Sequence, residues 1–195
     1  MKKNLIFPML MILVFAFSIA AQNKTADDKK QMNEKSFVKN DMAKTEANPA
    51  DVNSIDAIIK ATYDVISGEA NEKRDWQRFH SLFHPDARLI PSGKNPQTNV
   101  VSAKAFTPDQ YIERSEPFLN QGFFEQEISR KTQIFGSIAQ VFSTYEAKKT
   151  ASDEKPFMRG INSFQLLFDG KRWWIVTIYW QAETQEHPIP KEFLD

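Results

Sequence analysis

The chain has 195 residues, with 25 lysines and arginines against 25 aspartates and glutamates, so its formal net charge is zero. This balance argues against a nucleic-acid-binding protein, which would carry a strong basic excess. The sequence contains no cysteine, which excludes disulfide bonds, thiol catalysis and cysteine–zinc sites.

The first twenty residues have the pattern of a bacterial export signal. Lys2 and Lys3 precede an uncharged, mostly apolar run over residues 5–20, and Ser18 and Ala20 are small residues at the positions that a signal peptidase inspects. We therefore expect a signal peptide over residues 1–20 and a periplasmic or secreted protein. The alternative is an uncleaved anchor, which would then be the protein's contact with a membrane, although the run is short for a span.

The next stretch, residues 21–50, is polar and contains Phe37 as its one aromatic residue. Such a segment buries too little apolar surface to offset the entropy lost on ordering, so we expect a flexible linker. One domain is expected over residues 51–186, followed by a tail over residues 187–195. About 135 residues can hold one hydrophobic core.

The first half of the domain is predicted to be helical. Apolar residues in 55–66 recur at the three-and-four spacing of one helix face, and Asn53 or Ser54 can cap its start. A second helix carries Trp76, Phe79 and Phe83 on one face. It should end at residues 84–86, because the residue before a proline avoids helical geometry.

A short strand over residues 87–90 is expected next, then a loop over residues 91–103 with a weak strand near residues 100–101. Thr107, Pro108 and Asp109 predict a helix start, with a capping hydroxyl and a proline at the first helical position. We expect Pro117 to bend or end that helix.

The last third of the chain predicts four long antiparallel strands, over residues 123–135, 138–149, 157–169 and 172–183. Asp169-Gly170 is a strong signal for a tight turn between the last two. In the final strand the period of two places Thr177, Tyr179 and Gln181 on one face and Ile178 and Trp180 on the other. Long curved strands after several helices indicate a sheet wrapped around a pocket.

Three segments carry a resemblance to a known family: WQRFHSLFHPDARL (76–89), GSIAQVFSTYE (136–146) and DGKRWWIVTIYW (169–180). They resemble the second helix and first-strand entry, the central hairpin strand and the closing strand of the nuclear transport factor 2-like superfamily. That group includes the SnoaL-like cyclases, ketosteroid isomerase and scytalone dehydratase. The resemblance implies an α+β fold, in which a curved antiparallel sheet wraps around N-terminal helices as a cystatin-like cone.

The catalytic residues of the ketosteroid isomerase branch do not carry over to this sequence. By register, the position of its general base falls near Pro91, which cannot act as a base. The position of its oxyanion tyrosine falls near Ala61, and Tyr63, two residues on, is expected to point roughly the opposite way. The resemblance therefore implies that this chemistry is absent or rearranged.

His80 and Asp86 are the candidate catalytic residues, because a histidine oriented by an aspartate can act as a general base. The resemblance supports this, since histidine–aspartate pairs serve dehydratases of the superfamily. Asp75 is an alternative partner. The simpler interpretation is that His80 is half buried beside the face formed by Trp76 and Phe79.

His80 and His84 are four residues apart, a spacing that can bring two imidazoles to one metal on a helix. The helix is expected to break at His84, so we expect no metal site. The sequence also lacks a phosphate-binding loop or a dinucleotide-binding glycine motif, and we expect no cofactor.

Seven residues are predicted to line a ligand pocket because they combine neutral polar groups, one arginine and an aromatic wall. They are Trp76, Arg88, Tyr145, Asn162, Thr177, Tyr179 and Gln181. Alternatively, some of them face solvent, and Arg88 forms a surface ion pair.

The leading hypothesis is an exported domain that binds a small hydrophobic or amphipathic molecule in a cone-shaped pocket, without established catalysis. The second is a dehydratase, cyclase or isomerase that uses His80 and an aspartate. A third is a structural dimer module, since Trp174 and Trp180 can form an apolar interface. We expect a homodimer and no nucleic-acid partner.

Overall fold

The computed structural model describes residues 46–95 and 97–195, so the predicted signal peptide and most of the predicted linker lie outside the described residues. The helices are α2 (Pro49–Val52), α3 (Ile55–Ile66), α4 (Trp76–Leu82), α5 (Pro108–Leu119) and the 3-10 helix η1 (Lys191–Phe193). Within the described ranges, we find no helix that is both long and apolar enough to cross a membrane.

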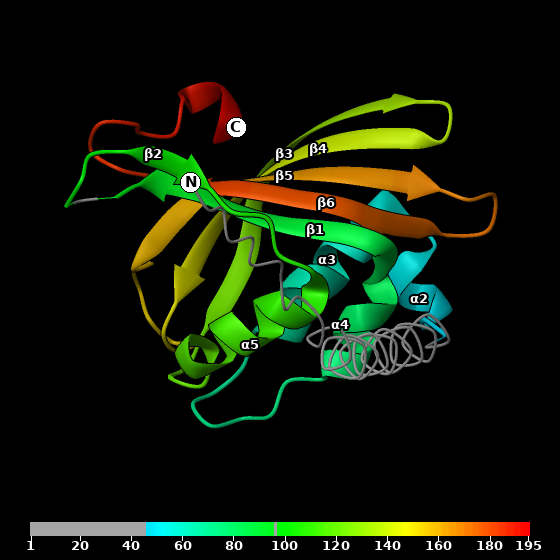
Figure 1. Ribbon diagram of the computed structural model, residues 1–195, viewed down its shortest axis with the longest axis horizontal. Helices are drawn as coiled ribbons and strands as arrows, with labels where there is room; N and C mark the ends of the chain where they lie inside the picture. The colour runs from blue at the N-terminus through cyan, green and yellow to red at the C-terminus, as the bar shows by residue number, and fades with distance from the viewer. Residues whose placement is uncertain (1–45, 96) are drawn as a thin grey trace, which may run out of the picture. The chain divides into compact units, whose positions relative to one another are not determined.

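Six strands form one sheet in the order β2-β1-β6-β5-β4-β3 (Figure 1). Their bounds are β1 (Phe83–Lys94), β2 (Val101–Ala103), β3 (Phe124–Phe135), β4 (Ile138–Lys148), β5 (Met158–Phe168) and β6 (Trp173–Ala182). Strands β3 to β6 form an antiparallel meander, as the hairpin signals predict. Strand β1 runs parallel to β6, so the sheet is mixed, and its antiparallel part is the predicted set of four long strands.

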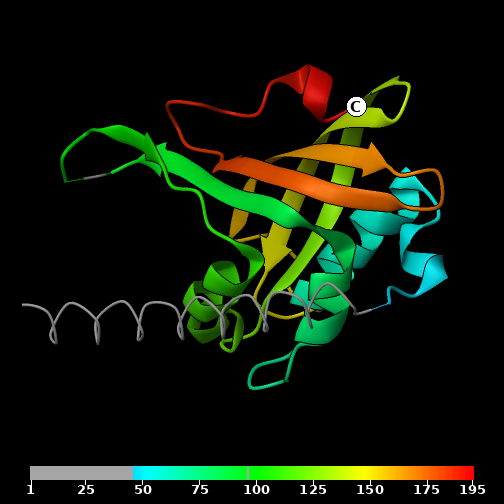
Figure 2. The same ribbon diagram turned by 45° about the vertical axis from the view of Figure 1, so that its right-hand side comes forward.

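The sheet curves over the helices, which lie against one of its faces (Figures 1 and 2). Its inner face and the apolar sides of α3 and α4 form the core, which includes the fully buried side chains of Ile58, Phe79, Leu82, Val141 and Phe164. The α+β class and the curved sheet around N-terminal helices are therefore confirmed.

Side-chain caps set the starts of the helices. Ser54 accepts a hydrogen bond from the amide of Ala57 at the start of α3, which confirms one of its two predicted caps. Thr107 caps α5 in a capping box with Gln110. The sequence predicted that this helix bends or ends at Pro117. The helix continues through Pro117 to Leu119, so it does not end there.

Strand β1 is much longer than the predicted strand over residues 87–90. It begins at Phe83, immediately after α4, and runs through Pro85 and Pro91 to Lys94. Strand β6 pairs with it from Phe83 to Ser92 and β2 from Ser92 onward, and Phe106 forms a single bridge with Leu89. Pro85 lies in the irregular stretch between Phe83 and Arg88, and Pro91 lies directly before the pairing with β2 begins. Proline, which cannot donate to the ladder, is tolerated at such irregular and marginal positions, and this explains the missed length.

Two β-bulges decide which side chains face the helices. In β3 the pairing shifts between Glu127 and Ser129, which places Glu127 and Arg130 on the same inner face although they are three residues apart. In β6 the pairing shifts near Val176, so that Ile175 and Ile178 both face the core.

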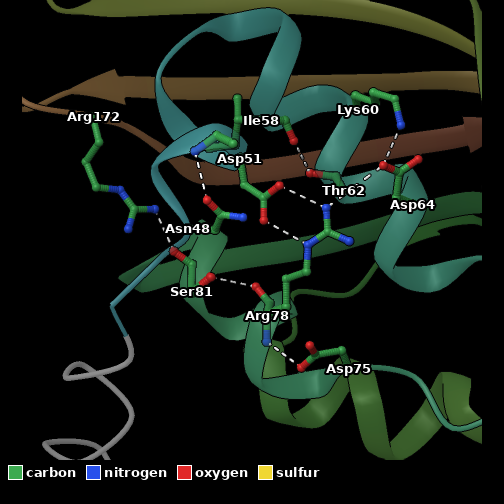
Figure 3. Close-up of polar contacts among 11 residues, drawn as sticks. Asn48, Asp51, Ile58, Lys60, Thr62, Asp64, Asp75, Arg78, Ser81 and Arg172 are labelled. Carbon is green, nitrogen blue, oxygen red and sulfur yellow. Dashed lines mark hydrogen bonds and ion pairs between the residues drawn. The ribbon is translucent and has the colours of Figure 1, made fainter.

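An ion pair ties α2 to α4 (Figure 3). The guanidinium of Arg78 donates two hydrogen bonds to the carboxylate of Asp51, at 2.8 and 2.9 Å, and lies 3.9 Å from Asp64 on α3. Asp75 caps α4 by accepting a hydrogen bond from the amide of Arg78. The start of the described chain is thus fixed to two helices of the domain.

The C-terminal tail packs on the outer face of the sheet, opposite the helices (Figure 1). Thr144 on β4 donates a hydrogen bond to the carbonyl of Phe193, and the rings of Phe142 and Phe193 lie 5.7 Å apart. At the other end, Ala47 is buried in the core. Residues on both sides of the predicted 51–186 boundaries therefore contribute to packing.

Candidate functional site

The concave side of the sheet and the helices enclose a cavity of about 220 Å³. Its walls come from α3, α4, α5 and strands β1 and β3 to β6, and they are mostly apolar. The lining residues are Thr62, Tyr63, Ile66, Phe79, Leu89, Tyr111, Ser115, Phe118, Leu119, Phe123, Glu125, Tyr145, Met158, Asn162, Phe164, Ile178 and Trp180.

Glu125 is the one ionisable carboxyl in this lining. It lies near the start of β3 on the inner face, opposite the buried Ala147 of β4. Its backbone is anchored to the end of α3, because its amide donates to the hydroxyl of Ser67 at 2.9 Å. The carboxyl oxygen Oε1 accepts a hydrogen bond from Asn162 Nδ2 at 3.2 Å.

A directed chain of hydrogen bonds starts at Asn162. Its amide nitrogen also donates to the hydroxyl of Tyr63 at 3.1 Å. Ser143 donates its proton to Glu127, so the 2.6 Å contact between Tyr63 and Ser143 must have Tyr63 as the donor. The chain ends at the ion pair of Glu127 with Arg130. Every polar member is satisfied, and this fixes the rotamers of Tyr63 and Asn162.

The electrostatics of the cavity favour neutral groups. Burial in the apolar cavity raises the pKa of Glu125 to about 8, although the hydrogen bond from Asn162 partly opposes the shift. Burial, and secondarily the charge of Glu125, raises the pKa values of Tyr63, Tyr111 and Tyr145 above the usual tyrosine value. At neutral pH the cavity therefore holds three phenols and a largely protonated carboxyl.

Two of the seven residues predicted for the pocket lie in this cavity. Tyr145 on β4 is only 2% exposed and Asn162 on β5 is 6% exposed, and both belong to the lining. Gly160 on β5 gives Tyr145 its space, since a Cβ there would lie 2.5 Å from the tyrosine hydroxyl.

The other five pocket candidates lie outside the cavity lining. Thr177, Tyr179 and Gln181 are on the outer face of β6, where Tyr179 is 46% exposed. Arg88 is exposed and donates to the carbonyls of Asp86 and Ala87. Trp76 packs against Phe79 and donates to Glu116 at 3.3 Å.

His80 and Asp86 are not brought together at the cavity. His80 Nε2 lies 3.2 Å from Asp109 on α5, and burial lowers its pKa although Asp109 opposes the shift. Asp86 is exposed on β1, where its amide donates to the ring of His84. Neither candidate lines the cavity, although His80 does lie within hydrogen-bond reach of an aspartate, Asp109.

Sequence reasoning missed Tyr63, Glu125 and Trp180. Tyr63 was expected to point away from the site, but its hydroxyl reaches the cavity from α3. Trp180 was considered for a dimer interface, yet it lines the cavity with its ring 6.1 Å from that of Tyr111. The sequence did contain a signal that could have identified Glu125. Phe123, Glu125 and Glu127 alternate along the strand, so the two acids share the inner face with a phenylalanine.

In residues 46–95 and 97–195, no group of three or more histidines and carboxylates converges as metal ligands. A second hollow includes Asn48, Asp75 and Ser81 and lies over the Arg78–Asp51 ion pair, whose hydrogen bonds Figure 3 shows. The carboxylate of Asp51 already accepts both hydrogen bonds of Arg78, and this hollow carries no candidate chemistry.

No family model matches the sequence, and no curated protein matches it. Among solved structures, a protein of unknown function with a cystatin-like fold from Nostoc punctiforme has 12% sequence identity and a TM-score of 0.52. That similarity covers 72% of this chain and 96% of the Nostoc protein.

Two further solved structures are similar with lower TM-scores. An uncharacterised protein with a cystatin-like fold from Caulobacter vibrioides has 14% identity and a TM-score of 0.49, covering 69% of this chain and 90% of its own. A nuclear transport factor 2-like superfamily protein from Salmonella enterica has 12% identity and a TM-score of 0.45, covering 77% and 94%. Identities this low compare folds, and functions do not follow from them.

Proposed function

We propose that this domain, which has the cystatin-like fold of nuclear transport factor 2-like proteins, binds one small, mostly apolar molecule in its cavity. The observation that carries the proposal is Glu125, the one ionisable carboxyl in the lining of a mostly apolar cavity. Burying such a group costs stability, and a few polar groups converging in an apolar pocket are typical of a binding site.

The size of the cavity limits the ligand. A cavity of about 150 Å³ in another protein holds benzene, so about 220 Å³ suits a molecule with on the order of ten non-hydrogen atoms. The predicted signal peptide would make this an exported binding function, and the expected homodimer belongs to the same proposal.

Binding can be followed at Met158, the one methionine among the described residues, which lines the cavity. We expect benzyl alcohol to shift the methyl NMR signal of Met158 in the full-length chain and to leave the signals of the methionines in residues 1–42 unchanged. Ser115→Phe fills the cavity from α5 and should abolish the shift.

The matched control is Ser163→Phe, which adds the same ring on the outer face of β5, beside Tyr179. It should leave the Met158 shift intact. If the Ser115→Phe variant does not fold, Ser115→Met replaces it in the test, because methionine adds less volume at the same position of the cavity wall. An unperturbed Met158 signal at saturating benzyl alcohol would refute the proposed function.

A second candidate function, proton transfer, is favoured by the pKa of about 8 for Glu125, which is close to the value that a general acid or base needs. We expect the full-length chain to exchange the α-protons of cyclohexanone in D₂O faster than buffer, and Glu125→Gln to remove the effect. His80→Gln should not change it, because His80 lies outside the cavity lining. Exchange at the buffer rate would exclude this activity for cyclic ketones.

A further inference from the structure

The cavity holds one acid and no base. None of the seventeen lining residues is lysine, arginine or histidine, and Lys149, outside the lining, lies with its Nζ 4.4 Å from the ring centre of Phe118. Arg130, on the same strand, is engaged by Glu127 and Asp56. Asn162 binds Oε1 of Glu125, and the structure shows no hydrogen bond to its second oxygen from a described residue. The carboxylate form of Glu125 therefore has no counter-ion in the cavity.

The walls around this carboxyl are largely aromatic. Eight of the lining residues carry aromatic rings: Tyr63, Phe79, Tyr111, Phe118, Phe123, Tyr145, Phe164 and Trp180. The face of an aromatic ring is the negative end of its quadrupole, and rings grouped around a site attract organic cations.

Two donor groups near Glu125, those of Asn162 and Tyr63, are already used, while the phenol of Tyr145 also lines the cavity. Asn162 donates one hydrogen to Glu125 and the other to Tyr63, and Tyr63 donates its own to Ser143. Once Glu125 is ionised, its second oxygen and the phenol oxygen of Tyr63 can accept hydrogen bonds from a ligand, whereas the neutral carboxyl presents an O–H at that second oxygen. Acceptors are complementary to a ligand that donates or is positively charged.

We propose that the ligand is a small organic cation, an amine or ammonium group on an apolar body, whose charge is the missing counter-ion of Glu125. This inference rests on the proposed function and names its ligand class. The apolar body fills the aromatic part of the cavity, and the positive group lies against the second carboxyl oxygen.

A proton balance follows from this arrangement. Tyr63 from α3, Tyr111 from α5 and Tyr145 from β4 face Glu125, and all three stay neutral because their pKa values are raised. Glu127, the next inner acid on β3, is paired with Arg130. Since the pKa of Glu125 is about 8 in the empty cavity, a bound cation should ionise it and release most of one proton at pH 7.

The test compares phenyltrimethylammonium with tert-butylbenzene, which has the same shape and no charge. Calorimetry of the full-length chain at pH 7, in two buffers of different ionisation enthalpy, measures the protons released. We expect the cation to bind at least tenfold more tightly than the neutral probe and to release nearly one proton. Glu125→Gln should remove the tenfold preference and the proton release, and keep the binding of tert-butylbenzene.

The outcomes separate the two proposals. If tert-butylbenzene binds as tightly as the cation, or if the cation binds without releasing a proton, the ligand class is wrong and the cavity remains a binding site. A preference for the cation that survives Glu125→Gln also overturns the inference. If neither probe shifts Met158, the proposed function itself fails.

Discussion

We expect Glu125→Gln to raise the free energy of unfolding by about 4 kcal/mol above pH 8 and to change it little at pH 4.5. The pKa of Glu125 rises from 4.5, the ordinary value that applies to the unfolded chain, to about 8 in the fold. Between these values the unfolded chain loses this proton while the folded one keeps it. The wild type is therefore destabilised as pH rises from 4.5 to 8, and glutamine, which stays neutral, removes that loss.

Urea unfolding of both proteins from pH 4.5 to pH 9 measures this difference. Glutamine can still accept the hydrogen bond from Asn162, so the variant isolates the charge. The matched control is Glu113→Gln, which removes an exposed carboxylate from α5 and should have the same small effect at every pH. A stability difference for Glu125→Gln that does not grow with pH would show that burial does not disfavour the Glu125 carboxylate.

This result would also bear on function. The destabilisation at high pH measures what the fold loses by keeping an acid in an apolar cavity without a counter-ion. A ligand that ionises Glu125 returns part of that free energy, so the same group that weakens the empty protein strengthens binding. Stability and ligand preference are thus two measurements of one buried carboxyl.

The elements that sequence predicted well depend on local chemistry. The Asp169-Gly170 turn and the alternation on either side fixed the last hairpin to within a residue. Ser54 and Thr107 marked two helix starts, because capping depends on residues close in the chain. The resemblance correctly implied the cone-like fold.

The position of β1 could not be predicted in the same way. A parallel pair with β6 joins residues about ninety positions apart, and nothing local records it. Pro85 and Pro91 argued against a strand, but Pro85 lies where the pairing with β6 is irregular, between Phe83 and Arg88, and the carbonyl of Pro91 still accepts a hydrogen bond from Lys104.

The site was predicted in part, and the errors on β6 and at Glu125 have separate physical origins. The period of two separated Thr177, Tyr179 and Gln181 from Ile178 and Trp180 correctly, but periodicity does not say which face meets the helices. The helices cover the face of Trp180, so the three polar residues lie outside. Asn162 and Tyr145 were found because they are neutral polar residues on long strands. Glu125 was missed because acids on strands usually face solvent.

The second large effect is expected at Arg74, a buried arginine that holds the ends of two cavity-forming helices. Its side chain donates to the carbonyl of Ile66, the last residue of α3, at 2.9 Å and to that of Leu119, the last residue of α5, at 3.2 Å. It also donates to the carbonyls of Gly68 and Glu72. A cation at two helix C-termini is favourable as well, because it complements both helix dipoles.

We expect Arg74→Met to lower the free energy of unfolding by about 3 kcal/mol, since methionine keeps much of the packing volume and removes every donor. Leu119 and Gly68 retain backbone partners in Gly122 and Phe123. The carbonyl of Ile66 has no other hydrogen bond among the described residues, so the loss should concentrate at the end of α3.

Urea unfolding at pH 7 measures this loss, and Arg88→Met is the matched control. Arg88 also donates to backbone carbonyls, but it is exposed, and its removal should change stability by about 0.5 kcal/mol or less. Ile66 and Leu119 line the cavity, so Arg74→Met should also weaken the Met158 response to benzyl alcohol. Equal effects for the two arginines would mean that water replaces the guanidinium at Ile66, and that the cavity walls do not depend on Arg74.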